Sequence, residues 1–162
     1  MVRIAVMSEN LSHINEKGEA HMVDVSSRDE SIRIAVASGK VKLRPEVLNL
    51  IAQGQAPKGD VLATARVAGI LGAKKTSELI PLCHPIAIHS VVIDLTIESG
   101  YIAITSTVKT GDRTGVEMEA LTAVTVTALT LIDMVKALDP YAEIKEVQMI
   151  SKSGGRNGEW KR

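Results

Sequence analysis

The stretch from Lys58 to Pro85 reads KGDVLATARVAGILGAKKTSELIPLCHP and holds the clearest local structural signals of the chain. Asp60 stands where a helix needs an N-terminal cap. Apolar residues then recur at the spacing of one helix face, at Val61, Ala65, Ala68 and Leu71. Lys74 and Lys75 close this helix, where the helix dipole favours cations. A second, short helix can be capped by Thr76 or Ser77 and has to stop near Pro81.

The end of this stretch places a cysteine and a histidine, Cys83 and His84, between two prolines. Such a segment is stiff, so the backbone sets the position of the histidine. Three interpretations of His84 are open: a core histidine with satisfied hydrogen bonds, a metal ligand, or a catalytic acid or base. A metal site is the weakest choice, because the chain has no Cys-x-x-Cys and no paired histidines. A nucleophilic Cys83–His84 dyad is also disfavoured, because adjacent side chains in a stiff segment point apart.

The composition fits one domain over residues 1–162 with an aliphatic core, because there is no Phe, one Trp and two Tyr. The formal net charge of zero argues against broad affinity for nucleic acid or an anionic membrane. A single cysteine excludes an intrachain disulfide and is typical of a reducing compartment. We find no apolar run of membrane-spanning length and no signal peptide, so we expect a cytoplasmic protein.

The order of predicted elements outside the opening stretch indicates the fold class. Residues 1–18 lack periodicity and are expected to be loose, 110–115 form a loop, and 153–162 form a glycine-rich basic tail. Strands are predicted over five segments: 19–26, 31–43 with a bending turn at 39–40, 86–98, 101–109 and 143–151. Helices are predicted from Pro45 and over 116–138, the latter ending at Asp139-Pro140. This order predicts an α+β fold, an antiparallel sheet with helices packed on one face.

The predicted helix over 116–138 is apolar around most of its circumference, so we expect burial on nearly all sides. It nevertheless carries Glu117, Glu119, Asp133 and Lys136, and isolated buried charges cost several kcal/mol, on the order of the known desolvation penalties. Asp133 and Lys136 share one face, either as an ion pair without further role or as an acid/base pair at a ligand site. Glu117 and Glu119 in the first turn also suit the helix dipole.

Several cations are candidates for binding an anionic ligand: Arg28, Arg33, Lys58, Arg113, Lys152 and Arg156. Most lysines and arginines are solvated surface residues. Lys58, however, precedes a helix N-terminus and Lys152 precedes Ser-Gly-Gly, and both contexts offer backbone N–H groups to an anion. The loop 111–115 is a weaker candidate and lacks Gly-Lys-Ser/Thr, which argues against P-loop NTPase chemistry.

Motifs in four parts of the chain resemble the cyclic pyranopterin monophosphate synthase family, also called molybdenum cofactor biosynthesis protein C. They are GEAHMVDVS at 18–26, KGDV at 58–61 with PLCHP at 81–85, TGVEMEA at 114–120 and KSGG at 152–155. The resemblance runs from about Leu11 to Lys161. It implies a ferredoxin-like subunit that assembles as a hexamer, a trimer of dimers. Arg113 stands where relatives often have lysine, and Ser27-Arg28 replaces a small residue and a lysine.

The resemblance also implies a reaction and a set of site residues. A partner radical enzyme supplies 3′,8-cyclo-7,8-dihydroguanosine 5′-triphosphate, which is rearranged to cyclic pyranopterin monophosphate with loss of pyrophosphate. Proton transfers fall to the expected catalytic residues, Asp133, Lys136 and Lys58. The expected substrate-binding residues are Leu82, Cys83, His84, Glu117, Met118, Glu119, Lys152, Arg28 and Arg33, the cations serving as fixed charges for the phosphates.

No metal and no redox cofactor is implied, although Mg²⁺ can accompany the triphosphate. Two rival classes remain: a ferredoxin-like regulatory module that binds a small ligand without catalysis, and a structural subunit that forms oligomers.

The helix over 116–138 also predicts that each active site is shared by two chains. Glu119 and Asp133 are fourteen positions apart (133 minus 119), which is about 21 Å along a straight helix. One compact reacting centre cannot touch both from a single helix. An antiparallel second copy in a two-fold dimer brings the start of one helix beside the end of the other.

Overall fold

The computed structural model describes residues 14–15, 17–155 and 158–162. The candidate cation Arg156 and most of the N-terminal segment expected to be loose lie outside the described residues. The elements follow the order β1 (Ser31–Lys42), α1 (Pro45–Ala52), α2 (Val61–Lys74), α3 (Thr76–Leu79), β2 (Ile88–Glu98), β3 (Tyr101–Asp112), α4 (Glu117–Val135), β4 (Glu143–Ser153) and β5 (Trp160–Lys161).

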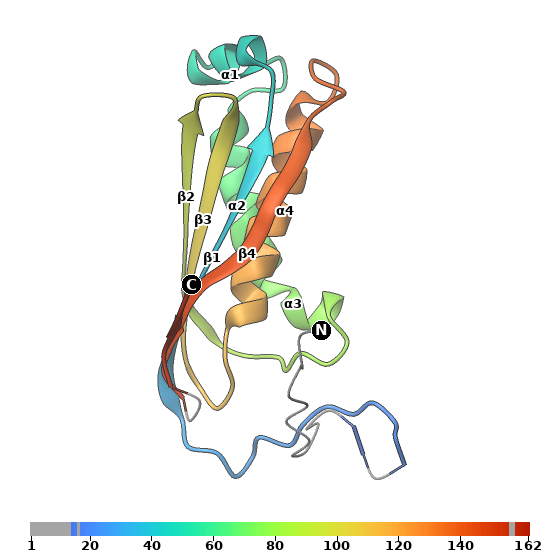
Figure 1. Cartoon of the computed structure of the whole chain (residues 1–162), viewed down its shortest axis with the longest axis vertical. Coiled ribbons are helices and arrows are strands. Elements are labelled where there is room, and N and C mark those ends of the chain that lie inside the picture. The colour runs from blue at the N-terminus through green and yellow to red at the C-terminus, as the bar shows by residue number, and fades with distance from the viewer. Residues whose placement is uncertain (1–13, 16, 156–157) are drawn as a thin grey trace, which may run out of the picture.

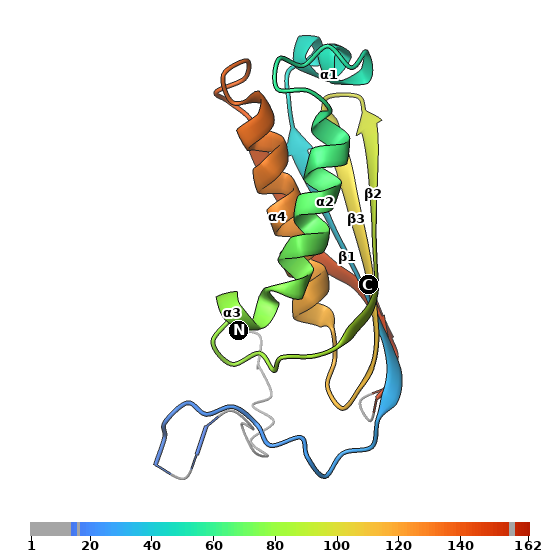
Figure 2. The same ribbon diagram turned by 180° about the vertical axis from the view of Figure 1, so that it is seen from behind.

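The strands form one antiparallel sheet with the order β2-β3-β1-β4-β5 (Figure 1). Helices α2 and α4 lie side by side over one face of this sheet (Figure 2). The first four strands and the helices between them follow the ferredoxin-like β-α-β-β-α-β pattern. The predicted α+β fold, with its helices on one face of an antiparallel sheet, is therefore confirmed.

The core lies between this sheet and the two long helices. Alternate residues of β1 and β3 face the helices and are buried: Ala35, Ala37, Val41, Ile102, Ile104 and Val108. Small residues let α2 and α4 approach closely. A side-chain carbon at Gly69 of α2, for instance, would overlap the hydroxyl of Thr127 on α4.

The capping predictions for the opening stretch hold for α2 and fail for α3. The Asp60 side chain accepts a hydrogen bond from the Ala63 backbone N–H at 2.9 Å, as an N-cap does. At α3 the cap position is Lys75, and the hydroxyl of Thr76 donates instead to the Ala73 carbonyl in the preceding helix. A cap therefore depends on how the chain enters the helix, which residue type alone does not decide.

Three strand predictions need correction. Residues 19–26 form no strand, apart from an isolated bridge between Ile14 and Ala20, and the Val23 and Ser26 carbonyls accept hydrogen bonds from side chains instead of from a neighbouring strand. Strand β1 runs through 39–40 without a turn, and the irregular register lies in its pairing with β4. Strand β3 continues to Asp112, in the predicted loop, because Asp112 pairs with Ser31.

Helix α4 is less enclosed than its sequence predicts. Met118, Leu129 and Asp133 are exposed, with Leu129 55% accessible. By length and composition α4 is also apolar enough to cross a membrane, so the expectation that no apolar run reaches that length is wrong. In the fold this helix packs against α2 and against β1, β3 and β4, the arrangement of a core helix.

Candidate active site

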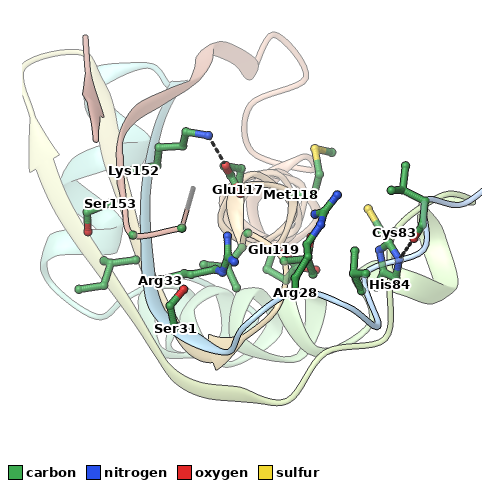
Figure 3. A pocket seen from close by; sticks show the side chains of 18 of the residues that line it. Arg28, Ser31, Arg33, Cys83, His84, Glu117, Met118, Glu119, Lys152 and Ser153 are labelled. Carbon is green, nitrogen blue, oxygen red and sulfur yellow. Dashed lines mark hydrogen bonds and ion pairs between the residues drawn. The ribbon is translucent and has the colours of Figure 1, made fainter. Parts of the chain in front are cut away.

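A pocket of about 900 Å³ opens at the N-terminal end of α4. Its walls come from four parts of the chain: the segment before and at the start of β1, the Cys83-His84 segment, the turn into α4, and the end of β4. All nine residues expected to bind substrate line it: Leu82, Cys83, His84, Glu117, Met118, Glu119, Lys152, Arg28 and Arg33 (Figure 3). The fold therefore brings together motifs that are far apart in the sequence.

Sequence reasoning missed several polar residues of the pocket wall: Asp29, Ser31, Thr114 and Ser153. Each lies within a few residues of a predicted site residue. Ser31, for example, is two positions from Arg33 on β1, and residues i and i+2 of a strand face the same side. The two-residue period of the strand is the signal by which Ser31 could have been predicted from Arg33.

Arg33 has a fixed guanidinium in this pocket. Its Nε donates to the Asp112 carbonyl at 2.9 Å and its Nη2 donates to the Arg113 carbonyl at 3.0 Å. A side-chain carbon at Gly155 would overlap the guanidinium, so the glycine leaves room for it. Arg33 is thus a positioned cation at the pocket wall rather than a mobile surface arginine.

Lys152 and Glu117 form an ion pair inside the pocket, with 3.0 Å between Nζ and Oε1 (Figure 3). Each of the two side chains is about one-third accessible. Lys152 comes from β4 and Glu117 from the first turn of α4, so the pair links the sheet to the helix. Glu117 therefore has a specific partner besides the helix dipole.

His84 holds the segment that crosses the pocket. Its Nε2 lies 2.7 Å from the Val23 carbonyl, and because a carbonyl only accepts, Nε2 carries the proton. In the neutral form of the ring, Nδ1 is then an acceptor. Arg113 holds the same segment through a 2.9 Å hydrogen bond to the Ser26 carbonyl. These two side chains replace the strand pairing that the sequence predicted for 19–26.

Glu119 is the most deeply buried carboxyl group of the pocket, with 4% of its surface accessible. Burial raises the pKa of Glu119 from its ordinary value of 4.5 to about 7, and the charge of Glu117 adds to the shift. Burial also raises the pKa of the Cys83 thiol, with a further contribution from Glu119. Cys83 is therefore a thiol near neutral pH, which agrees with the argument against a Cys–His nucleophile.

This shift of Glu119 predicts an unusual dependence of stability on pH. Between about 4.5 and about 7 the folded chain binds more protons than the unfolded chain. The free energy of unfolding should therefore fall as the pH rises through this window, by on the order of 3 kcal/mol in total. Glu119→Gln should remove this dependence, because its amide is neutral at every pH.

Denaturant unfolding of the wild type and Glu119→Gln at several pH values between 4.5 and 8 measures this effect. We expect the variant to gain stability relative to the wild type as the pH rises. The exposed Glu98→Gln serves as the control and should follow the wild type. Parallel curves for the wild type and Glu119→Gln would contradict the buried-acid assignment.

The three residues expected to be catalytic gather at the other end of the helical layer. Asp133 receives a hydrogen bond from Lys136 Nζ to Oδ1 at 2.6 Å, and Lys58 Nζ lies 3.3 Å from Oδ2. Lys58 also donates to the Asp133 backbone carbonyl at 2.8 Å, in the last turn of α4. Both side-chain hydrogen bonds lower the pKa of Asp133, and the one from Lys136 contributes more than the one from Lys58. Asp133 is thus a carboxylate between two ammonium groups. The sequence predicted the contact with Lys136 but not the one with Lys58.

Within one chain the structure does not unite the two groups of predicted residues. Lys58, Asp133 and Lys136 are absent from the pocket wall. Asp133 lies about 21 Å along α4 from Glu119, given the rise of a helix. The part of the chain that the structure describes also holds no group of three His, Cys, Asp or Glu side chains arranged for a metal ion.

Comparison with known proteins identifies the family of this chain. The profile of the MoaC family matches residues 22–155. A cyclic pyranopterin monophosphate synthase of Streptomyces griseus is 57% identical over 152 residues, which cover 94% of this chain and 86% of the relative. Cyclic pyranopterin monophosphate synthase 2 of Mycobacterium bovis is 55% identical, covering 96% and 93%. The synthase of Thermomicrobium roseum is 54% identical, covering 94% and 93%.

Proposed function

Since this chain belongs to the MoaC family, we propose that it is a cyclic pyranopterin monophosphate synthase, a lyase of molybdenum cofactor biosynthesis. It converts 3′,8-cyclo-7,8-dihydroguanosine 5′-triphosphate to cyclic pyranopterin monophosphate and releases pyrophosphate. The observation that carries this proposal is the pocket at the start of α4, which unites every predicted substrate-binding residue. The alternative of a ferredoxin-like module that only binds a ligand leaves the Lys58–Asp133–Lys136 cluster without a role.

The pocket supplies the groups that such a substrate needs. Arg28, Arg33 and Lys152 are the cations for the phosphates, and charge that develops on the leaving pyrophosphate is stabilised by such fixed groups. Glu119, half protonated near pH 7, can exchange a proton with the purine-derived ring. His84 lines the same pocket and, in its neutral form, offers Nδ1 as an acceptor. Substrate binding and part of the proton transfer thus fall to this pocket.

The Lys58–Asp133–Lys136 cluster provides the remaining proton transfers. The lowered pKa of Asp133 keeps it ionised, so at the start of a turnover it can accept a proton but has none to give. Lys58 and Lys136 carry protons and are held within hydrogen-bond distance of its carboxylate. We assign proton donation in this cluster to the lysines, and the positioning of both lysines to Asp133.

Each active site in this proposal combines the pocket of one chain with the cluster of a second chain. Support comes from the separation of the two groups along α4 and from apolar side chains that the helical layer exposes. Val67 and Leu71 of α2 and Leu129 of α4 are each more than half accessible. Burial of these side chains between two antiparallel copies favours a two-fold dimer. By family resemblance, three such dimers form the hexamer.

The remaining parts of the proposal rest on the sequence. The reaction needs no redox cofactor, and Mg²⁺ enters, where it takes part, with the triphosphate. The single cysteine is typical of a protein of a reducing compartment such as the cytoplasm.

Incubation of the full chain with the cyclised triphosphate tests the function. We expect release of one pyrophosphate for each pterin product, both measured over time. Binding of the substrate without pyrophosphate release would favour the regulatory module. Lys58→Ala should abolish turnover while the oligomer stays intact, whereas a purely structural subunit would show no turnover even in the wild type. Lys74→Ala, an exposed lysine in the last turn of α2, is the matched control and should retain activity.

A further inference from the structure

The pocket contains an anion of its own, in contact with one of its cations. Glu117 Oε1 lies 3.0 Å from Lys152 Nζ, and both residues line the pocket. Lys152 lies near the C-terminal end of strand β4, next to Ser153 and Gly154, which also line the pocket. The charge of Lys152 is thus met by a carboxylate of the same chain.

Gly115 provides the space that this carboxylate occupies. A side-chain carbon at Gly115 would overlap Glu117 Oε2. The φ angle of Gly115 lies outside the left-handed region, so its backbone does not itself require glycine. What glycine contributes at this position is room for the carboxylate beside Lys152.

A phosphate bound to Lys152 would face Glu117 at ion-pair distance. Like charges at that distance repel strongly in a partly buried pocket. Glu119 lies close enough for the charge of Glu117 to raise its pKa, so a second acidic group already crowds the same site. A phosphate and the Glu117 carboxylate are therefore alternative partners of Lys152.

We propose that Glu117 is an internal anion that pairs with Lys152 until a phosphate group displaces it, and that this competition makes the pocket selective for polyphosphates. This inference rests on the proposed function, from which the triphosphate substrate follows. A singly charged anion cannot replace a carboxylate that is already tethered beside the lysine at high effective concentration. A polyphosphate carries more charge and also reaches Arg33, whose guanidinium is fixed at the same wall.

Calorimetric titration of the full chain with inorganic pyrophosphate in metal-free buffer tests this exchange. Glu117→Gln removes the competing charge, so we expect pyrophosphate to bind about three- to tenfold more tightly. Lys152→Ala should weaken binding by about tenfold or more. In the Lys152→Ala background, Glu117→Gln should no longer tighten binding, because the two residues act through one contact.

Gly115→Ala provides a steric test that leaves every charge in place. The added methyl group should displace the carboxylate and also tighten pyrophosphate binding. The control is Gly111→Ala, whose new carbon would make only an ordinary contact with His89. The control for charge is Glu30→Gln, which removes a carboxylate that pairs with Arg113 at 3.6 Å and does not line the pocket. Both controls should bind pyrophosphate like the wild type.

Selectivity has its own readout. Acetate should compete with pyrophosphate in Glu117→Gln but not in the wild type. The salt of a bulky sulfonate replaces acetate in the reference titrations, so that the ionic strength stays constant. Weaker pyrophosphate binding by Glu117→Gln would show that Glu117 binds the ligand directly and would overturn the inference. So would a tightening that persists without Lys152, since it would reflect general electrostatics. Failure of turnover, with these binding results as expected, would instead count against the proposed function alone.

Discussion

Two inactive variants, Glu119→Ala and Asp133→Ala, are expected to regain about a quarter of wild-type activity when they are unfolded together and refolded as a mixture. The two carboxyl groups lie on one helix, α4. Glu119 faces the pocket at the start of this helix, and Asp133 contacts Lys58 and Lys136 near the end of the same helix. If a site takes Glu119 from one chain and Asp133 from the other, a mixed dimer has one intact site and one doubly altered site. Random pairing makes half of the dimers mixed, so about a quarter of all sites are intact.

The control for this experiment pairs two lesions within one cluster. Lys58→Ala mixed with Asp133→Ala should give no recovery, because each site then carries one lesion from whichever chain supplies the cluster. Glu119 is buried, so Glu119→Ala can also impair folding. His84→Ala paired with Lys58→Ala provides a second combination across the two groups. No recovery in either cross-group mixture, with mixed oligomers confirmed by mass spectrometry, would refute the shared site.

Asp133→Asn is expected to lower turnover by about two to four orders of magnitude while the fold and ligand binding persist. The amide keeps the shape of the side chain but loses the charge that holds Lys58 and Lys136 and that can accept a proton. Because the Asp133 side chain is 57% accessible, the thermal midpoint should stay close to that of the wild type. Single-turnover kinetics with the cyclised triphosphate, beside a melting curve, measure both quantities.

Glu78→Gln is the matched control for Asp133→Asn. Glu78 forms the same kind of ion pair, to Lys75 three positions away, on an exposed surface. Its loss should leave turnover unchanged. Near-normal turnover of Asp133→Asn would mean that the cluster is an ordinary surface ion pair and would remove Asp133 from the mechanism.

Local signals in the sequence were sufficient for most of the elements. The N-cap at Asp60, the proline that opens α1 and the turn at Gly100 between β2 and β3 each depend on residues only a few positions apart. Local signals failed at residues 19–26, whose alternation predicted a strand. A strand also needs a partner strand, and the carbonyls of Val23 and Ser26 in this segment are bonded by the side chains of His84 and Arg113 instead.

The sequence by itself determined the family, the fold class and nine residues of the pocket wall, because short motifs carry that information. Only the tertiary structure decided which of those residues meet. Lys58 and Asp133 are 75 positions apart, yet they form the cluster that lies away from the pocket. Lys152 meets Glu117 across the pocket, and burial gives Glu119 its raised pKa. Such contacts and such burial arise when distant segments pack together, so no local pattern records them.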